Sequence, residues 1–178
     1  VGTDPLTIGF QPGSDETGPF YQSPLTSIYV NRELVASESY AAARNQTDEG
    51  IFSTSFNGAV VKVTLQGNVN TISDYMFSGV NMQTIWIPRE VTSIGNSAFE
   101  NAPNIYGLNF DECVNLSIGA NAFKNCENLQ NFLNFMATTV SIGDSAFENC
   151  SNIDFIQFAD SADVVIGSNA FANCNNLK

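Results

Sequence analysis

Hydrophobic and polar positions recur along the chain at a regular interval. The segment IGDSAFENCSNI, which begins at Ile142, has close copies that begin at Ile94, Ile118 and Ile166. The interval between successive copies is the same each time, and a fainter copy, ISDYMFSGVNM, begins at Ile72, a slightly shorter interval before Ile94. A period of about 20 to 30 residues is typical of a solenoid, in which each repeat is one coil that buries its apolar face only against its neighbours. The pattern therefore predicts a stack of coils with one core.

A strand is predicted after each copy of the repeated segment. Apolar residues stand there at the first, fourth and sixth places, and the last two alternate with an outward position, as in a strand with one buried face. Equivalent strands of neighbouring coils should pair as a parallel sheet along one side of the stack. The triplets are Met82, Ile85 and Ile87; Ile105, Leu108 and Phe110; and Ile153, Ile156 and Phe158.

The copy LQNFLNF departs from this spacing. It has Phe132 at the fourth place but Asn134 at the sixth, with Leu133 and Phe135 beside them. Either a β-bulge shifts the register of this strand, or Leu133 points outward. The sequence is compatible with both alternatives.

The repeated segment itself predicts a single turn of helix. In the copy at Ile94, Gly95 is expected to supply the backbone freedom that a tight corner needs. Ser97 and Glu100 then form the S-x-x-E pattern of a capping box, in which both side chains satisfy free amides at the start of a helix. An asparagine follows at once in each regular copy, and asparagine tolerates the left-handed conformation that ends a helix. The other cap positions are Asn121, Ser145 (followed by Glu148) and Asn169, and the terminating asparagines are Asn101, Asn125, Asn149 and Asn173.

Two residue types are expected to fill the core at the same place in successive coils. A phenylalanine recurs in every copy, and a cysteine follows it at a fixed spacing in three of them, where Ala102 and Val80 stand in two others. Stacked coils put equivalent side chains parallel to one another, which favours buried free thiols over disulfides. The phenylalanines are Phe77, Phe99, Phe123, Phe147 and Phe171, and the cysteines are Cys126, Cys150 and Cys174, while Cys113 lies outside the column.

Residues 1–71 contain two weaker copies of the strand pattern. Segments rich in Gly, Pro, Ser, Asn and acidic residues interrupt them, which indicates loops. Terminal repeats are expected to be atypical because they cap the stack. We therefore expect residues 1–71 to form degenerate coils with loop insertions that cap the same solenoid, and residues 72–178 to form regular repeats of roughly 22 to 24 residues each. The weaker triplets are Leu25, Ile28 and Val30, and Val60, Val63 and Leu65.

Composition and charge exclude several classes of function. Six Lys and Arg against 18 Asp and Glu give a formal net charge of -12, which disfavours nucleic acids and anionic membrane surfaces as partners. No apolar run approaches the roughly 20 residues of a membrane span, so we expect no membrane insertion by this segment. The chain has no histidine, which removes Ser-His-Asp and Cys-His nucleophiles and His-bearing zinc sites. Because no CxxC pair and no calcium-loop pattern occur either, we expect no catalytic residue, no metal and no cofactor.

The segments IPREVTSIGNSAFENAPNI and VSIGDSAFENCSNI resemble the BspA-type leucine-rich repeats of bacterial surface proteins. The resemblance covers nearly the whole chain, strongly from Ile72 onward and loosely before it. It implies an α/β repeat solenoid, a right-handed arc with a parallel β-sheet on its concave side and single-turn helices or irregular turns elsewhere. It further implies an extracellular or cell-surface location, after removal of an export signal that this sequence does not contain, and adhesion to host proteins or other cells. The family's pattern fixes core positions, so it assigns no binding residue.

If the strands stack in register, their outward side chains form a surface along the sheet. One outward column reads Tyr29, Thr64, Trp86, Asn109, Leu133 and Gln157, and the column two residues earlier reads Ser27, Lys62, Thr84, Gly107, Asn131 and Phe155. Trp86, the only tryptophan, would suit a protein or carbohydrate partner there, since aromatic anchors carry much interface energy. Alternatively, it only shields the sheet. The candidate ligand-binding residues are Tyr29, Lys62, Thr84, Trp86, Asn109, Asn131, Phe155 and Gln157.

Two hypotheses about function follow. In the first, the chain is a non-enzymatic binding module whose partner is a host extracellular or cell-surface protein or glycan. In the second, it is a structural spacer that presents a neighbouring domain and has no ligand of its own. A screen against extracellular-matrix proteins and glycans distinguishes the two.

Overall fold

The fold is a stack of coils built from short parallel strands and turns. The computed structural model describes residues 6–8, 27–30, 34–36, 62–65, 69–110 and 113–178, and these residues contain no helix. The predicted solenoid is therefore confirmed, whereas the predicted α/β class with single-turn helices is wrong. The loops expected within residues 1–71, together with Leu25 and Val60, lie outside the described residues.

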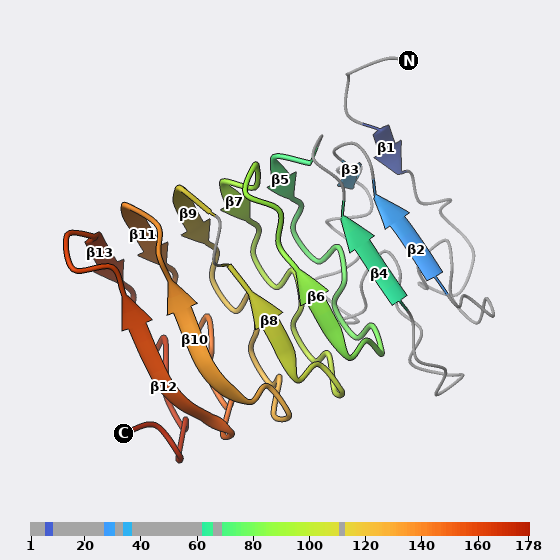
Figure 1. The fold of residues 1–178 in the computed structure, drawn as a ribbon. Coiled ribbons are helices and arrows are strands. Elements are labelled where there is room, and N and C mark those ends of the chain that lie inside the picture. The colour runs from blue at the N-terminus through green and yellow to red at the C-terminus, as the bar shows by residue number, and fades with distance from the viewer. Residues whose placement is uncertain (1–5, 9–26, 31–33, 37–61, 66–68, 111–112) are drawn as a thin grey trace.

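Two rows of strands run along opposite sides of the stack (Figure 1). The first row comprises β2 (Ser27–Val30), β4 (Lys62–Leu65), β6 (Thr84–Trp86), β8 (Gly107–Asn109), β10 (Asn131–Phe135) and β12 (Ile153–Phe158). These strands are hydrogen-bonded in parallel pairs, β2 with β4, β6 with β8 and β10 with β12. This row takes the place of the sheet predicted from the apolar triplets, but its hydrogen bonds join three separate pairs of strands instead of one sheet. The row includes the weak copies, since Ile28 lies opposite Val63 and Val30 opposite Leu65.

The second row is a continuous parallel sheet that the sequence indicated only as an extended segment, VTSI. It comprises β5 (Thr71–Ile72), β7 (Ser93–Ile94), β9 (Asn115–Ile118), β11 (Thr139–Ile142) and β13 (Asp163–Ile166). These strands pair in the order β13-β11-β9-β7-β5. A separate parallel pair, β1 (Leu6–Ile8) with β3 (Leu34–Ala36), lies at the N-terminal end of the stack (Figure 1).

The predicted phenylalanine column lies in the core and forms a ladder of stacked rings. The ring centroids of Phe77 and Phe99 are 5.3 Å apart, and those of Phe99 and Phe123 are 4.9 Å apart. Phe147 follows at 5.1 Å from Phe123, and Phe171 at 5.2 Å from Phe147. The first four rings are fully buried, while Phe171, in the last coil, is partly buried. Each coil therefore adds one ring to a continuous apolar column, as predicted.

A second phenylalanine ladder lies beside the first. The Phe110, Phe135 and Phe158 rings stack with centroid distances of 5.0 and 5.4 Å. Phe110 also meets Phe123 edge-on at 6.2 Å, and Phe135 meets Phe147 edge-on at 6.4 Å. Stacked and edge-on contacts are both favourable arrangements of aromatic rings, so the two ladders hold each other in place.

The irregular copy LQNFLNF pairs with the register shift that one of the two alternatives required, and the extra residue, Asp154, lies on the partner strand β12. The pairing of β10 with β12 shifts between Asn131 and Phe132. As a result, Leu133 lies opposite Ile156 and is only 1% exposed, so the alternative in which Leu133 points outward is wrong. The shift also places Phe135 opposite Phe158, which keeps the second ladder intact.

The turns of the repeated segment use their backbone amides in two alternating ways. The Ser97 and Phe99 amides donate to the Ala120 and Ala122 carbonyls of the next coil at 2.9 and 2.7 Å. An intervening amide donates backward within its own turn, as that of Glu100 does to the Ser97 carbonyl at 3.2 Å. An α-helix needs each amide to donate to the fourth residue before it in its own segment. Because every second amide bonds to the next coil, the turn forms a ladder between coils in place of the predicted helix.

The predicted capping box is wrong for the same reason. Ser97 and Ser145 have φ angles of 51° and 54°, whereas a residue that caps a helix is extended. The Glu148 carboxylate instead accepts hydrogen bonds from the Lys124 ammonium, at 2.9 Å, and from the Ser145 hydroxyl, and both contacts lower its pKa. The asparagines that end the turns are left-handed as predicted, with φ of 56°, 61°, 64° and 61° at Asn101, Asn125, Asn149 and Asn173.

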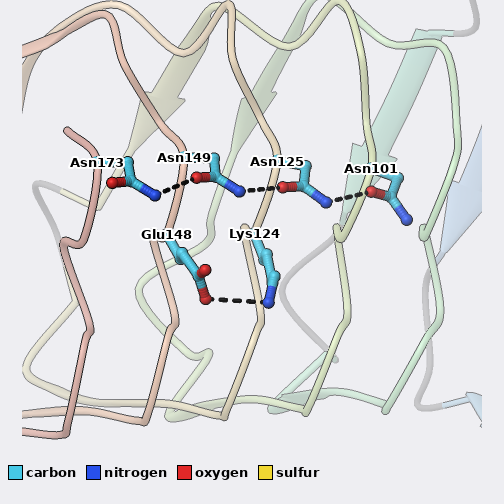
Figure 2. Close-up of polar contacts among 6 residues, drawn as sticks. All are labelled: Asn101, Lys124, Asn125, Glu148, Asn149 and Asn173. Carbon is cyan, nitrogen blue, oxygen red and sulfur yellow. Dashed lines mark hydrogen bonds and ion pairs between the residues drawn. The ribbon is translucent and has the colours of Figure 1, made fainter. Parts of the chain in front are cut away.

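These asparagines also form a ladder of side-chain amides that the sequence did not predict (Figure 2). The Asn125 Nδ2 atom donates to Asn101 Oδ1 at 2.7 Å, and Asn149 Nδ2 donates to Asn125 Oδ1 at 2.6 Å. Asn173 Nδ2 continues the ladder to Asn149 Oδ1 at 2.8 Å. Each interior amide therefore both donates and accepts one hydrogen bond across a coil boundary.

The glycine in the repeated segment is needed for close packing of the coils. Among the described glycines, only Gly79 has a positive φ, so the expectation that Gly95 supplies unusual backbone freedom is wrong. A Cβ atom on Gly95 would lie 2.5 Å from the Asp74 nitrogen, and one on Gly143 would lie 2.7 Å from the Ala120 nitrogen. The absence of a side chain thus allows successive backbones to touch.

The cysteine column is buried as predicted. The Cys126 and Cys150 side chains are fully buried, and their Sγ atoms donate to the Phe99 and Phe123 carbonyls at 3.1 Å. Burial raises the pKa of Cys126 to about 12 and also raises the pKa of Cys150. The thiols are therefore protonated over the physiological range of pH.

We expect native Cys126 to react with iodoacetamide about 1000-fold more slowly than in urea at pH 8, because only the thiolate is nucleophilic and each unit of pKa changes its fraction about tenfold. Mass spectrometry of the labelled peptides measures the two rates.

The same pKa predicts a pH dependence of folding stability. Since the unfolded thiol ionises above pH about 9 while the folded one stays protonated, the contribution of Cys126 to folding stability should fall as the pH rises from about 9 to 12. Equal labelling of native and unfolded chain would contradict both expectations.

Candidate binding face

The outward side chains of the first strand row form the face that we call the outward face. The pairing register places Thr84 opposite Gly107 and Phe132 opposite Phe155. The full set, in two columns, is Lys62, Thr84, Gly107, Phe132 and Phe155, and Thr64, Trp86, Asn109, Asn134 and Gln157.

Most of the predicted binding residues lie on this face, with one correction. Asn131 lies opposite Ile153, because the pairing skips Asp154 of β12, and Phe132 takes the outward place that the sequence assigned to Asn131. In the other column, Asn134 lies opposite Gln157 and replaces Leu133. The broken apolar spacing of LQNFLNF signals an irregularity here but does not decide its kind. A bulge was one of two open alternatives.

The remaining predicted residues keep their places. Trp86 lies opposite Asn109, and Tyr29 lies opposite Thr64 in β2, although the side chain of Tyr29 is outside the described part. Asn109 belongs to β8, and this strand lies between β6 and β10 in the row (Figure 1).

Three aromatic side chains on the outward face are open to solvent. Trp86 is 57% exposed, and Phe132 and Phe155 are 47% and 48% exposed. The Lys178 ammonium lies 5.6 Å from the centroid of the Phe155 ring. The face therefore has one exposed aromatic side chain on β6 and a pair of them on β10 and β12.

A hollow opens on the outward face between β4 and β6. These strands are neighbours in the row, but they belong to different hydrogen-bonded pairs (Figure 1). The hollow has a volume of about 500 Å³. It brings together three predicted residues, Lys62, Thr84 and Trp86, and its other lining residues are Val63, Thr64, Leu65 and Gln83. No pattern in the sequence signals the hollow or the place of Gln83 in its wall, since both depend on a break in strand pairing.

Lys62 differs from the other cations of the described residues. Arg89 lies 3.3 Å from Glu90, Lys124 lies 2.9 Å from Glu148, and Lys178 lies over Phe155. Lys62 is exposed at the hollow, and no carboxylate of the described chain lies within ion-pair distance of it. The hollow thus combines an ammonium group that has no ion pair among the described residues, the only tryptophan of the chain, and hydroxyl and amide side chains.

No group of three or more His, Cys, Asp or Glu side chains in the described ranges lies close enough together to hold a metal ion. In the same residues, no helix has the length and apolar character needed to cross a membrane.

The comparison with known families matches almost the entire sequence. The model of the BspA-type leucine-rich repeat region matches residues 15–106 and 48–178, with six copies of the repeat. The chain belongs to the BspA-type leucine-rich repeat family. Members of this family are protein-interaction repeats and are typically non-enzymatic. Comparisons with curated proteins and with solved structures found no significant match.

In this BspA-type chain, the repeats keep their core and vary their surface. The core phenylalanine is the same from Phe77 to Phe171, whereas the first outward column has a different residue in nearly every coil. Stacking of the coils requires the core phenylalanine but does not depend on which residue stands at the outward position. The outward face is therefore the part of the repeat that is free to specify a partner.

Proposed function

We propose that this chain is a non-enzymatic binding module, displayed at a bacterial cell surface or secreted, that attaches to a host or neighbouring-cell protein or glycan through its outward face. The observation that carries this proposal is the exposure of Trp86, Phe132 and Phe155 on outward positions of the strand row. Its family membership supports an interaction role.

Exposed aromatic side chains suit an interface better than they suit solvent. Phe and Trp each bury a large area on binding and lose few rotatable bonds, so they are frequent anchors of interfaces. The core of this stack is already filled by two other phenylalanine ladders, so Trp86, Phe132 and Phe155 are not required for stacking. They are consequently available to a partner.

The charge of the chain narrows the class of partner. A formal net charge of -12 opposes binding to nucleic acids and to anionic membranes, because both carry dense negative charge. Proteins and glycans remain as partners, and these are the molecules that an adhesive protein meets outside the cell.

Replacing Trp86 by Ala is expected to weaken partner binding about 30-fold or more, since a central aromatic anchor contributes about 2 kcal/mol or more. The thermal unfolding midpoint should stay within about 1 °C, because the side chain is 57% exposed. The partner is first found by screening labelled protein on arrays of extracellular-matrix proteins and glycans, and affinity is then measured by surface plasmon resonance.

Val165→Ala is the matched control. Val165 is 62% exposed but lies in β13, in the second strand row, so its removal should leave binding unchanged. Equal binding by the Trp86 variant would exclude the outward face as the interface. The absence of any saturable partner on the arrays would favour the structural spacer.

A further inference from the structure

We propose that the hollow between β4 and β6 binds a sugar that bears a carboxylate, such as a uronic or sialic acid unit of a glycan. This inference rests on the proposed function, because the hollow is part of the outward face, and it specifies the ligand that the face would recognise there.

The size of the hollow fits a short stretch of oligosaccharide. Its volume of about 500 Å³ lies within the roughly 300 to 1,000 Å³ that is usual for small-ligand sites. A stable protein partner would cover about 800 Å² of each surface, an area far wider than one gap between two strands. The hollow is therefore a site for one or a few sugar units.

Trp86 supplies an aromatic surface at one wall of the hollow. One face of a pyranose ring presents mainly C–H groups, which pack favourably against an aromatic ring. The same wall carries Gln83 and Thr84, and Thr64 faces it from β4. Amide and hydroxyl groups of this kind donate and accept hydrogen bonds, as sugar hydroxyls require.

Lys62 accounts for the preference for an acidic sugar. Among the described residues that line the hollow, Lys62 is the single cation and none is acidic. An ammonium on a flexible stem is a compact point charge that suits one carboxylate, whereas a phosphate dianion usually calls for more than one positive group. Elsewhere the net charge of -12 repels an anion, so the hollow is where an acidic ligand gains a favourable contact.

The only tryptophan of the chain provides a direct test with the intact protein. Trp86 fluorescence is followed during titration with sialyllactose and with lactose, which share the neutral sugars, and with oligogalacturonate and its methyl ester, which share the uronic backbone. We expect the Trp86 fluorescence to change saturably with at least one acidic sugar. The affinity for that sugar should be tenfold or more above the affinity for its neutral counterpart. A response in the sialyllactose and lactose pair indicates a sialic acid, and a response in the oligogalacturonate and methyl ester pair indicates a uronic acid. Salt at about 0.5 M should reduce this difference, because screening weakens an exposed charge contact.

Two variants with the same change in net charge separate the role of Lys62 from a general charge effect. Lys62→Gln should remove the discrimination and leave weak binding of the neutral sugar. Arg89→Gln should behave as the unaltered chain, since Arg89 is exposed and does not line the hollow. Normal unfolding transitions confirm that both variants are folded.

Three results would overturn the inference: equal binding of acidic and neutral sugars, retained discrimination in Lys62→Gln, or no response to any of the four sugars at millimolar concentration. An acidic peptide that binds more tightly than every sugar would also overturn it and assign the hollow to a protein. Any of these results leaves the proposed function standing if the arrays yield a partner that requires Trp86, so the two failures are distinguishable.

Discussion

Replacing Phe123 by Ala is expected to lower the free energy of unfolding by about 3–5 kcal/mol, the usual range for truncating a fully buried phenylalanine. The Phe123 ring stacks on Phe99 at 4.9 Å and on Phe147 at 5.1 Å, and its edge meets Phe110 at 6.2 Å. The truncation therefore leaves a cavity at the point where the two phenylalanine ladders touch. Denaturation in urea, followed by circular dichroism, measures the loss.

Phe171→Ala is the matched control for this prediction. Phe171 occupies the same place in the last coil, but it is partly buried and stacks on one ring, Phe147. Its truncation should cost about half as much or less, since the cavity opens toward solvent. A loss for Phe171→Ala equal to that for Phe123→Ala would show that the central column is not what holds the coils together.

Replacing Asn125 by Ala is expected to cost about 3–4 kcal/mol, although its side chain is only partly buried. Its φ of 61° is left-handed, and that conformation costs an alanine about 1–2 kcal/mol. The substitution also removes the hydrogen bonds to Asn101 and Asn149, at 2.7 and 2.6 Å, each worth about 1 kcal/mol (Figure 2). Urea denaturation again provides the measurement.

Asn125→Gly separates the two causes. Glycine adopts the left-handed conformation freely, so this variant loses only the ladder contacts and should cost about 2 kcal/mol. Asn173→Gly, at the last described rung, loses the one ladder bond that its side chain makes to Asn149 and should cost about 1 kcal/mol. If Asn125→Gly were as stable as the unaltered chain, the amide ladder would have no part in stability.

The stack and its core could be predicted from the sequence because both repeat. An apolar residue such as Phe123 or Cys126 recurs at the period, and stacked coils bury such a residue in a continuous column. Left-handed asparagines could be predicted too, because tolerance of that conformation is a property of the single residue. These features depend on the repeat or on local chemistry, and the sequence displays both.

The helical turn was predicted wrongly because the decisive hydrogen bonds are not local. Ser97 and Glu100 have the spacing of a capping box, yet the Ser97 amide donates to Ala120 in the next coil. Nothing within a single repeat shows whether this amide takes part in a helix of its own coil or donates to the next coil. The second strand row was missed for a related reason, since segments as short as β5 and β7 become a sheet only when the coils align them.

The candidate site could be predicted in outline but not in detail. Alternation placed Trp86, Thr84 and Lys62 outward, and all three line the hollow. The bulge that exposes Phe132, and the break between β4 and β6 that opens the hollow, are irregularities in an otherwise regular array. The broken spacing of LQNFLNF indicates the first irregularity only as one of two alternatives, and no pattern in the sequence indicates the second.

The hydrogen bonds of the turns run from each coil to the next in the same way, from Phe77 to Ala98, Phe99 to Ala122, Phe123 to Ala146 and Phe147 to Ala170. The turns therefore meet through one shared hydrogen-bond pattern, so duplication or deletion of one repeat unit in the gene joins turns that already match. One unit inserted between β6 and β10 would move the Phe132 and Phe155 pair about 5 Å farther from the hollow. The spacing between the hollow and the exposed phenylalanine pair is thereby open to evolution in steps of a single unit, without redesign of the interior.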